Sequence, residues 1–450
     1  MAKQKIKYVC SNCGYETLRW VGKCPECENW NTFTEELIES SRRKPAKTSQ
    51  NIPLHNINEI KADEEERIKT GINELDQVLG GGFMPGSVVL LGGDPGIGKS
   101  TLAMQIASGL QEKVLYVTGE ESLKQIKLRA DRLKIIPHKF FILPETDLSP
   151  IISAIEETKA PVVIIDSIQT IYRTEYENAP GTITQLRECT AALQEEAKKN
   201  NLTVILIGHV TKEGFIAGPK ILEHIVDTVI QFEGESGSTY RILRSQKNRF
   251  GSTNEIGIFE MLQNGLREVT NPSEIFLSGR GTETSGSVIT ATVEGTRPIL
   301  LEVQALVTPG AYGYPQRVSN GFDQRRLSIL LAVLEKRAKL KLSNFNVFVN
   351  IAGGLRVMEP SVDLAVCAGI VSSLRERLIK KNTVAIGEVG LGGEMRSVSQ
   401  IEKRIQEAEK LGFENIVLPA GKLKGKKIKS RINIIPAEDI ISAIKSLLKE

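Results

Sequence analysis

One short segment constrains the fold of this 450-residue chain more than any other. Residues 93–100 read G-D-P-G-I-G-K-S and fit the phosphate-binding pattern G-x-x-x-x-G-K-S. Residues 88–91 read as a buried strand and residues 102–107 as an apolar helix, which is the context this pattern requires. The glycines let backbone N–H groups curl around phosphates, and the helix start adds positive charge. We therefore predict an α/β domain in which ATP contacts Gly93, Asp94, Pro95, Gly96, Ile97, Gly98, Lys99, Ser100 and Thr101.

Two further predicted strands end in acidic residues. Residues 113–118 precede Glu120 and Glu121, and residues 161–166 end in Asp166. The carboxyl ends of parallel strands meet at one edge of a sheet, so these side chains are expected beside the nucleotide. Glu120 is expected to orient the attacking water, with Glu121 as the alternative, and Asp166 is expected to order Mg²⁺.

Three more side chains are assigned to the same site. Lys99 is expected to contact the β- and γ-phosphates, and Ser100 is expected to hold Mg²⁺ together with Asp166. A fourth predicted strand at 202–208 is followed by His209. This histidine either senses the γ-phosphate or is an ordinary surface residue, and the sequence leaves both interpretations open.

The N-terminal segment carries a second strong pattern. Four of the six cysteines form two C-x-x-C pairs that are separated by ten residues. This spacing predicts a closed tetrahedral site for structural Zn²⁺, whose binding would fold a segment too short for a core of its own. Four unrelated thiols are the alternative, and Cys189 and Cys367 are expected to be inert core thiols. The predicted zinc ligands are Cys10, Cys13, Cys24 and Cys27.

Composition excludes several classes of protein. With 40% hydrophobic and 25% charged residues the chain is globular, and its length predicts roughly three domains. No apolar run reaches the roughly 18 residues of a membrane span, and the N-terminus lacks the apolar part of a secretory signal. We therefore predict a cytoplasmic protein with no membrane partner and with reduced cysteines. A net charge of +4 does not by itself indicate nucleic-acid binding.

Residues 244–251 read R-S-Q-K-N-R-F-G and follow a predicted strand at 239–243. Lys247 and Arg249 are two residues apart, so on extended chain their side chains point to the same side. Two cations on one side predict a negatively charged target. A basic hairpin end on open surface is the alternative.

The order of these motifs resembles a known family. The phosphate-binding loop is preceded by T-G-I-N-E-L-D-Q-V-L-G-G-G (70–82) and followed by Y-V-T-G-E-E-S, V-V-I-I-D-S and S-Q-K-N-R-F-G, as in the RecA-type ATPase core. With the four-cysteine module in front, the whole chain resembles the RadA (Sms) family of bacterial DNA repair proteins. The resemblance implies a DNA-stimulated ATPase that forms a ring homo-oligomer, a hexamer. It also implies action on single-stranded and branched DNA, by translocation, branch migration or heteroduplex extension, beside a RecA-type recombinase.

The same resemblance assigns a role to the motif formed by Lys247, Asn248, Arg249, Phe250 and Gly251. ATP lies between neighbouring subunits in RecA-type assemblies. Lys247 and Arg249 would therefore stabilise the transferred phosphoryl group in trans, as arginine fingers do. The expected catalytic residues are then Lys99, Glu120, Asp166, Lys247 and Arg249.

Beyond residue 272 the chain contains E-P-S-V-D-L-A-V-C-A-G-I-V-S-S-L (359–374) and V-A-I-G-E-V-G-L-G-G-E-M-R-S-V (384–398). This part resembles the proteolytic domain of Lon, whose chemistry needs a serine and a lysine. Ser361 occupies the place of the nucleophile, but the position of the lysine falls at Glu402. Lys403 is adjacent, and one helical step turns its side chain by about 100°. A serine without a neighbouring base is not activated, so the domain is predicted to be proteolytically inactive.

Basic residues in this last part form a candidate DNA surface. The resemblance implies that the domain supports assembly and DNA binding, and the run at 421–431 is rich in lysine. A solubilising basic face is the alternative. The candidate DNA contacts are Arg317, Arg325, Arg326 and Lys336.

Together the patterns predict a four-cysteine zinc finger at 1–35, a flexible linker at 36–55, a RecA-like ATPase domain at 56–272 and an α+β Lon-like domain at 273–450. Two other functions stay open. An ATP-dependent peptidase would need the missing base, and a nucleotide-gated scaffold would hydrolyse ATP at a rate indifferent to DNA.

Overall fold

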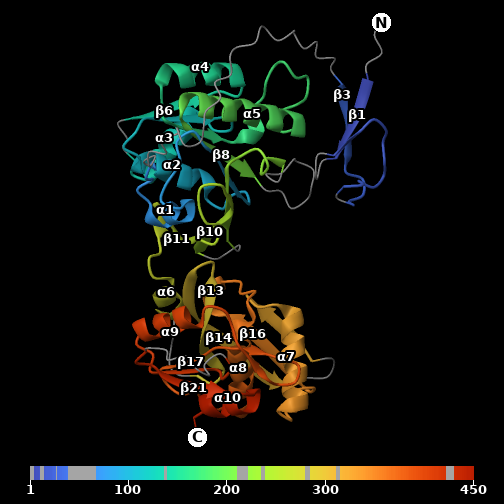
Figure 1. Cartoon of the computed structure of the whole chain (residues 1–450), viewed down its shortest axis with the longest axis vertical. Helices are drawn as coiled ribbons and strands as arrows, with labels where there is room; N and C mark the ends of the chain where they lie inside the picture. Colours follow the sequence, from blue (N-terminus) through green and yellow to red (C-terminus); the bar gives the residue numbers. More distant parts are fainter. Residues whose placement is uncertain are drawn as a thin grey trace, which may run out of the picture. The chain divides into compact units, whose positions relative to one another are not determined.

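In the computed structural model the chain divides into two compact units. One comprises Met1–Gly234 and Arg241–Glu268, and the other comprises Glu235–Tyr240 and Val269–Glu450 (Figure 1). None of the helices in the described part of the chain has the length and apolar character that a membrane crossing requires. Most of the predicted linker lies outside the described residues. The structure describes residues 5–10, 15–26, 28–38, 67–135, 139–209, 221–234, 239–278, 284–310, 315–421 and 430–449.

The N-terminal module is a three-stranded antiparallel sheet in the order β2-β1-β3. One turn closes with a hydrogen bond from Cys10 N to Tyr15 O, and a second closes from Cys24 N to Asn29 O, both 2.9 Å long. Each turn therefore begins at a cysteine of the predicted metal site. The strands are β1 (Lys5–Cys10), β2 (Glu16–Thr17) and β3 (Phe33–Ile38).

A nine-stranded sheet in the order β12-β11-β10-β9-β4-β8-β7-β5-β6 forms the centre of the first unit. The strands from β9 to β6 pair in parallel, whereas β10 runs antiparallel to β9 and β12 antiparallel to β11. Parallel strands that are buried on both faces read as continuous apolar runs, as V-V-L-L in β4 does. The strands are β4 (Val88–Gly93), β5 (Val114–Thr118), β6 (Phe140–Pro144), β7 (Val162–Asp166), β8 (Thr203–His209), β9 (Thr228–Glu233), β10 (Tyr240–Asn248), β11 (Ile256–Leu262) and β12 (Gly265–Glu268).

Helices cover both faces of this sheet. Successive strand residues point to opposite faces, so Val89 and Leu91 of β4 join one buried cluster and Val88 and Leu90 join another. The first cluster contains side chains of α1 (Asn73–Leu79), α2 (Lys99–Gly109) and α3 (Leu123–Arg132). The second contains those of α4 (Leu148–Thr158) and α5 (Ile183–Asn200), which Figure 1 shows together on one side. The result is a three-layer α/β/α domain.

The second unit contains a mixed seven-stranded sheet in the order β15-β16-β14-β13-β17-β20-β21. Helices α6 and α9 pack on the face that carries Ile289 and Ala291 of β13, whereas Gly369 of α8 lies against Val288 on the other face. Helix α8 also contacts α7 and α10. The helices are α6 (Pro272–Ser278), α7 (Gln324–Arg337), α8 (Asp363–Arg375), α9 (Ile401–Lys410) and α10 (Ile440–Leu447). The strands are β13 (Ser287–Glu294), β14 (Arg297–Pro309), β15 (Arg317–Asn320), β16 (Phe345–Ile351), β17 (Thr383–Ala385), β20 (Asn415–Pro419) and β21 (Asn433–Ala437), with the pair β18 (Glu388–Val389) and β19 (Met395–Arg396) beside them.

Candidate functional site

The carboxyl ends of the central strands bring the predicted nucleotide-binding residues to one edge of the sheet. Gly93, at the end of β4, is in register with His209 at the end of β8. Asp166, at the end of β7, is in register with Thr118 of β5 and Ile207 of β8. The loop from β4 to α2 therefore begins beside the two segments that carry Asp166 and the acidic pair after β5.

Lys99 is folded onto the phosphate-binding loop itself. Its side chain is almost fully buried, and its Nζ donates hydrogen bonds to Gly93 O (2.7 Å) and Asp94 O (2.9 Å). Burial lowers the pKa of Lys99 to about 8, although the nearby charges of Asp166 and Asp94 oppose the change. The ammonium is thus held at the mouth of a loop whose backbone is shaped for phosphates.

Side chains are disfavoured at two glycines near this edge. Gly98, directly before α2, has a φ of 115°, and a Cβ there would lie 2.5 Å from the Cε of Met261. A Cβ on Gly119, between β5 and Glu120, would lie 1.9 Å from the Oγ1 of Thr170. The contact at Gly119 excludes a side chain, whereas at Gly98 the flexible end of Met261 could move and the positive φ is what favours glycine.

Asp166 is oriented by a tyrosine that the motifs do not include. The hydroxyl of Tyr116, in the middle of β5, donates a hydrogen bond of 2.5 Å to Asp166 Oδ2. Burial, and after it the negative charge of Asp166, raises the pKa of Tyr116 well above its ordinary value, so the hydroxyl stays protonated. A polar hydroxyl within the otherwise apolar run V-L-Y-V was the signal available in the sequence.

The two neighbouring glutamates have different partners. Glu120 Oε1 accepts a hydrogen bond of 2.6 Å from the hydroxyl of Ser167 and lies 3.6 Å from His209 Nε2. Glu121 forms an ion pair with Arg129 of α3. Glu120 therefore faces the Asp166 edge, and Glu121 is held on the side of α3.

His209 lies within the site rather than on open surface. Burial, and after it the positive charge of Lys99, lowers the pKa of His209, so the imidazole is neutral near pH 7. Its Nδ1 and the Oε1 of Gln169 are buried without a hydrogen-bond partner in the described part of the chain. Gln169 Nε2 approaches the backbone oxygen of His209 at 3.4 Å. These groups carry unused hydrogen-bonding capacity next to Glu120.

The two cations of the 247–251 motif contact one turn of their own subunit. Lys247 Nζ donates hydrogen bonds to Glu223 O (2.6 Å) and Val226 O (2.7 Å). Arg249 lies 3.3 Å from a carboxylate oxygen of the buried Asp227. Burial, and after it the charge of Arg249, lowers the pKa of Lys247. The two side chains point to a common side, as predicted. There they bind the carbonyl oxygens of Glu223 and Val226 and the carboxylate of Asp227.

This motif lies at the edge of the sheet opposite the phosphate-binding loop. Lys247 of β10 is in register with Val229 of β9, which is in register with Leu90 of β4. The loop begins only after Gly93, about 10 Å farther along β4 at roughly 3.3 Å per residue. Since β10 runs antiparallel to β9, the residues after Lys247 continue away from the loop.

The rest of the motif is tied to the segment around α1. Asn248 Nδ2 donates to Leu79 O (3.1 Å), and Asn248 Oδ1 accepts from Phe250 N (2.9 Å). The oxygen of Phe250 accepts a hydrogen bond of 2.6 Å from Arg67. Gly251 packs closely against Gly80: a Cβ added to Gly80 would lie 3.5 Å from the Cα of Gly251. The motif is thus a fixed turn from which the ring of Phe250 is 36% exposed.

Two of the four predicted zinc ligands are described. Cys10 and Cys24 are both fully buried, and their backbone N–H groups donate to Tyr15 O and Asn29 O, while Cys13 and Cys27 lie outside the described residues. Each of these buried thiols is followed three residues later in the sequence by a second cysteine. This arrangement fits a closed site of four thiolates. Cys189 is buried in α5 and Cys367 in α8, each inside its domain.

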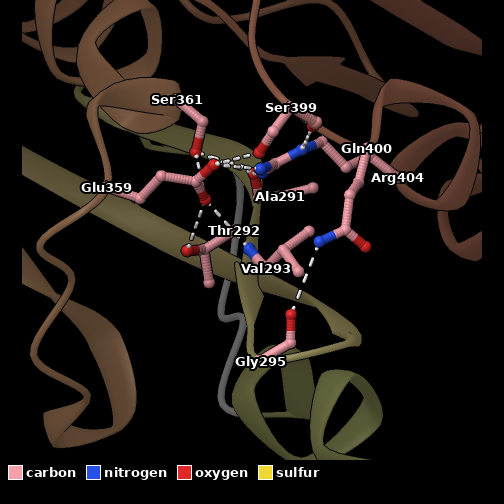
Figure 2. A network of polar contacts seen from close by, with 9 residues as sticks. All are labelled: Ala291, Thr292, Val293, Gly295, Glu359, Ser361, Ser399, Gln400 and Arg404. Carbon is pink, nitrogen blue, oxygen red and sulfur yellow. Dashed lines mark hydrogen bonds and ion pairs between the residues drawn. The ribbon is translucent and has the colours of Figure 1, made fainter. Parts of the chain in front are cut away.

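Ser361, in the C-terminal domain, is fully buried beside an arginine (Figure 2). Arg404 of α9 donates from Nη1 to the hydroxyl of Ser361 at 3.1 Å and from Nη2 to Glu359, which the hydroxyl also contacts at 3.0 Å. Lys403 points elsewhere, to Thr296 O (3.0 Å). The cation that lies next to the serine is thus Arg404, a residue that counting along the motif did not identify.

The four candidate DNA contacts are not equivalent. Arg317 donates to the carbonyl oxygens of Leu342 and Phe345. Arg326 forms a bidentate pair with the buried Asp363. Arg325 and Lys336 of α7 are exposed and eleven residues apart, so they lie on one face of that helix. Most of the basic run at 421–431 falls outside the described residues.

Three known families match parts of the chain. Residues 55–214 match the family described as AAA domain, residues 8–35 match the rubredoxin metal binding domain, and residues 321–422 match the subunit ChlI of Mg-chelatase. Fold and site thus define a RecA-like P-loop ATPase with an N-terminal metal-binding ribbon and a C-terminal α+β domain, which confirms the predicted fold class.

Two curated relatives align over the full length of the chain. The DNA repair protein RadA of Bacillus subtilis is 50% identical over 456 aligned residues, and that of Halalkalibacterium halodurans is 49% identical over 455, with all of both chains covered in each case. The chain belongs to the RadA family of DNA repair proteins. Among solved structures, the RadB recombinase aligns with 45% of this chain and 99% of its own at 26% identity and a TM-score of 0.37.

Proposed function

We propose that this chain is a DNA-stimulated ATP hydrolase that acts as a hexameric ring in recombinational DNA repair. It would move on single-stranded and branched DNA and extend heteroduplex or migrate junctions beside a RecA-type recombinase. The RadA family membership and the RecA-like ATPase fold support this function. The observation that carries it is the separation of Lys247 and Arg249 from the phosphate-binding loop of their own subunit.

That separation argues for catalysis between subunits. Lys247 is in register with Leu90, about 10 Å short of the loop that follows Gly93, and the chain then continues away from it. Neither cation can reach its own nucleotide from there. In a ring, the same edge of one subunit can face the loop of the next. There Lys247 and Arg249 would exchange their contacts with residues 223–227 for contacts with the transferred phosphoryl group.

The residues at the loop supply the remaining steps. Lys99 would exchange its bonds to Gly93 O and Asp94 O for bonds to the phosphates. Ser100 and Asp166 fit as ligands of Mg²⁺, which when bound neutralises phosphate charge. Glu120 fits the role of orienting and deprotonating the attacking water, because Glu121 is already paired with Arg129. His209 is close enough to Glu120 to report on the state of the γ-phosphate.

The C-terminal domain is proposed to be proteolytically inactive. A general base must accept a proton, and the guanidinium of Arg404, which donates to Ser361, remains protonated in proteins. The hydroxyl of Ser361 donates to Glu359, but that carboxylate is ion-paired with Arg404, which weakens it as a base. The likeness to Lon therefore concerns fold and not chemistry. Within the C-terminal domain, the exposed face of α7 that carries Arg325 and Lys336 is proposed to contact DNA.

Mixing two inactive variants tests the central claim. Lys99→Ala subunits lack the loop cation but keep Lys247, and Lys247→Ala subunits have the opposite defect. If Lys247 acts in trans, mixed rings contain some intact sites and recover DNA-stimulated ATPase activity. A mixture of Lys247→Ala with Arg249→Ala is the matched control, because no arrangement of those subunits restores a site.

Absence of recovery in the first mixture, with mixed rings verified by co-purification of two differently tagged variants, would contradict trans catalysis. The ATPase rate is measured with no DNA, single-stranded DNA and forked DNA. A rate indifferent to all three would favour the nucleotide-gated scaffold instead.

A further inference from the structure

A pocket of about 380 Å³ opens on the surface of the second unit. It lies where the end of α8 meets α10 and the chain just after α7, and its apolar wall includes Leu340, Val371 and Ile444. Ile441, on the first turn of α10, is 55% exposed at this pocket. The volume is at the lower end of the roughly 300–1,000 Å³ that ligand sites occupy.

Cations surround this apolar wall. Arg375, Arg377, Lys380 and Lys445 line the pocket and are exposed, and no acidic side chain of the described residues lines it. Within the same described part of the chain, none of these four has a carboxylate within ion-pair distance. Elsewhere in this domain arginines are paired, as Arg326 is with Asp363. The rim therefore concentrates positive charge, and the neighbouring Glu376 does not line the pocket.

Hydrogen bonds tie the walls of the pocket together. Lys380 N donates to Leu447 O (2.8 Å) and Lys449 N donates to Leu378 O (2.9 Å), so the segment after α8 is bound to the end of α10. The hydroxyl of Ser372 accepts from Gly286 N (2.9 Å) and donates to Arg377 O, which fixes the turn that carries two of the cations. A site that is formed before binding loses little entropy when it is filled.

We propose that this pocket binds an acidic peptide segment of a partner protein through one or two apolar side chains flanked by carboxylates. The apolar side chains would fill the wall of Val371, Ile444 and Ile441, and the carboxylates would pair with Arg375 and Arg377. Single-stranded DNA fits the pocket less well, because its lining of described residues contains no aromatic ring on which a base could stack. The proposal concerns a second binding site and does not depend on the proposed ATPase mechanism.

Fluorescence anisotropy of the full-length protein tests this assignment. The probe is a fluorescein-labelled peptide of consecutive aspartates ending in Leu-Phe, and its matched control ends in Ser-Ser. The Leu-Phe peptide should bind more tightly than the Ser-Ser peptide, and its affinity should fall with salt. The double variant Arg375→Glu/Arg377→Glu should bind at least about tenfold more weakly, as expected for loss of the anchoring charges.

One single variant tests the apolar part of the pocket, and a second serves as a control. Ile441→Ser should lower the affinity for the Leu-Phe peptide and leave that for the Ser-Ser peptide unchanged. Lys410→Glu reverses the charge of an exposed side chain on α9 that does not line the pocket, and it should leave both affinities as in the wild type. Circular dichroism and basal ATPase activity verify that each variant is folded.

Three results would overturn the proposal. Equal binding of the two peptides would make the rim an unspecific anion site. Displacement of the peptide by an oligothymidylate of equal charge at equal concentration would make it a nucleic-acid site. A change in sedimentation of Ile441→Ser, without any peptide present, would make a second copy of this chain the occupant.

Discussion

Nη1 of Arg404 donates a hydrogen bond to the hydroxyl of Ser361 over 3.1 Å, inside the C-terminal domain (Figure 2). The same guanidinium donates to Ala291 O (2.5 Å) and to Glu359, and its Nε donates to Ser399 O (3.0 Å). Arg404 thus connects β13, α9 and the segment before α8 while it is itself fully buried. Where a serine–lysine protease would hold its lysine base, this domain holds an arginine that is paired with Glu359.

Arg404→Ala should therefore destabilise the domain. The change leaves Glu359 and the Ala291 oxygen without their partner in a buried setting, and such losses cost about 3–5 kcal/mol of unfolding free energy. Chemical denaturation of the C-terminal unit measures the difference. Lys403→Ala is the matched control, since its exposed side chain contacts only Thr296 O among the described residues, and it should cost less than about 1 kcal/mol. Equal costs for the two variants would show that the buried network is not what stabilises the domain.

Glu120→Gln should abolish most ATP hydrolysis and preserve ATP binding. Removing a general base typically lowers the rate by about 10²–10⁴-fold, and the amide can still accept the Ser167 hydrogen bond. Steady-state ATPase assays and equilibrium binding of a fluorescent nucleotide measure the two effects. Glu121→Gln, which only weakens the pair with Arg129, should lower the rate by less than about tenfold. The assignment of Glu120 fails if Glu121→Gln is the more damaging change.

The exposed face of α7 should contribute to DNA affinity. Replacing both Arg325 and Lys336 with alanine should reduce the dependence of log K on log salt by about 0.7 for each phosphate that the variant no longer neutralises. Anisotropy of labelled single-stranded DNA at several salt concentrations gives this slope. Arg396→Ala removes an exposed arginine already paired with Glu394 and should leave the slope unchanged. If the double variant and this control have the same slope as the wild type, α7 does not contact DNA.

The parts of the site that the sequence predicted are those that lie close together along the chain. The phosphate-binding loop is one continuous segment, and Asp166 follows from the rule that parallel strands end at one edge. The hydrogen bonds of Tyr116 to Asp166 and of Ser167 to Glu120 depend on the register of β5 and β7, which only the folded sheet fixes. No local pattern could have specified them.

Helix rotation explains what counting missed in the C-terminal domain. Glu402, Lys403 and Arg404 are consecutive on α9, and each step turns the side chain by about 100°. Only Arg404 faces β13 and Ser361, and the start of α9 at Ile401 sets that rotation. The prediction that Arg317 and Arg326 contact DNA counted basic residues along the sequence. Such a count does not reveal that both side chains bond inside the domain, because their partners Phe345 and Asp363 are distant in sequence.

Titration of the thiols with a mercurial should divide the six cysteines into two classes. Burial raises the pKa of Cys189 to about 12 and that of Cys367 well above its ordinary value, so neither forms a reactive thiolate in the native protein near pH 8. Zinc should instead be released, detected by a chromophoric chelator, in step with modification of Cys10, Cys13, Cys24 and Cys27.

The two classes can be separated by variants. Cys24→Ser should remove the bound zinc, measured by atomic absorption, and leave the thermal melting of the ATPase core unchanged, because metal binding folds only the short ribbon. Cys189→Ser, the matched change of a buried thiol in α5, should keep the full zinc content. Zinc that persists in Cys24→Ser at the wild-type level would show that the ribbon cysteines are not its ligands, since a closed four-thiolate site cannot lose one ligand and keep its affinity.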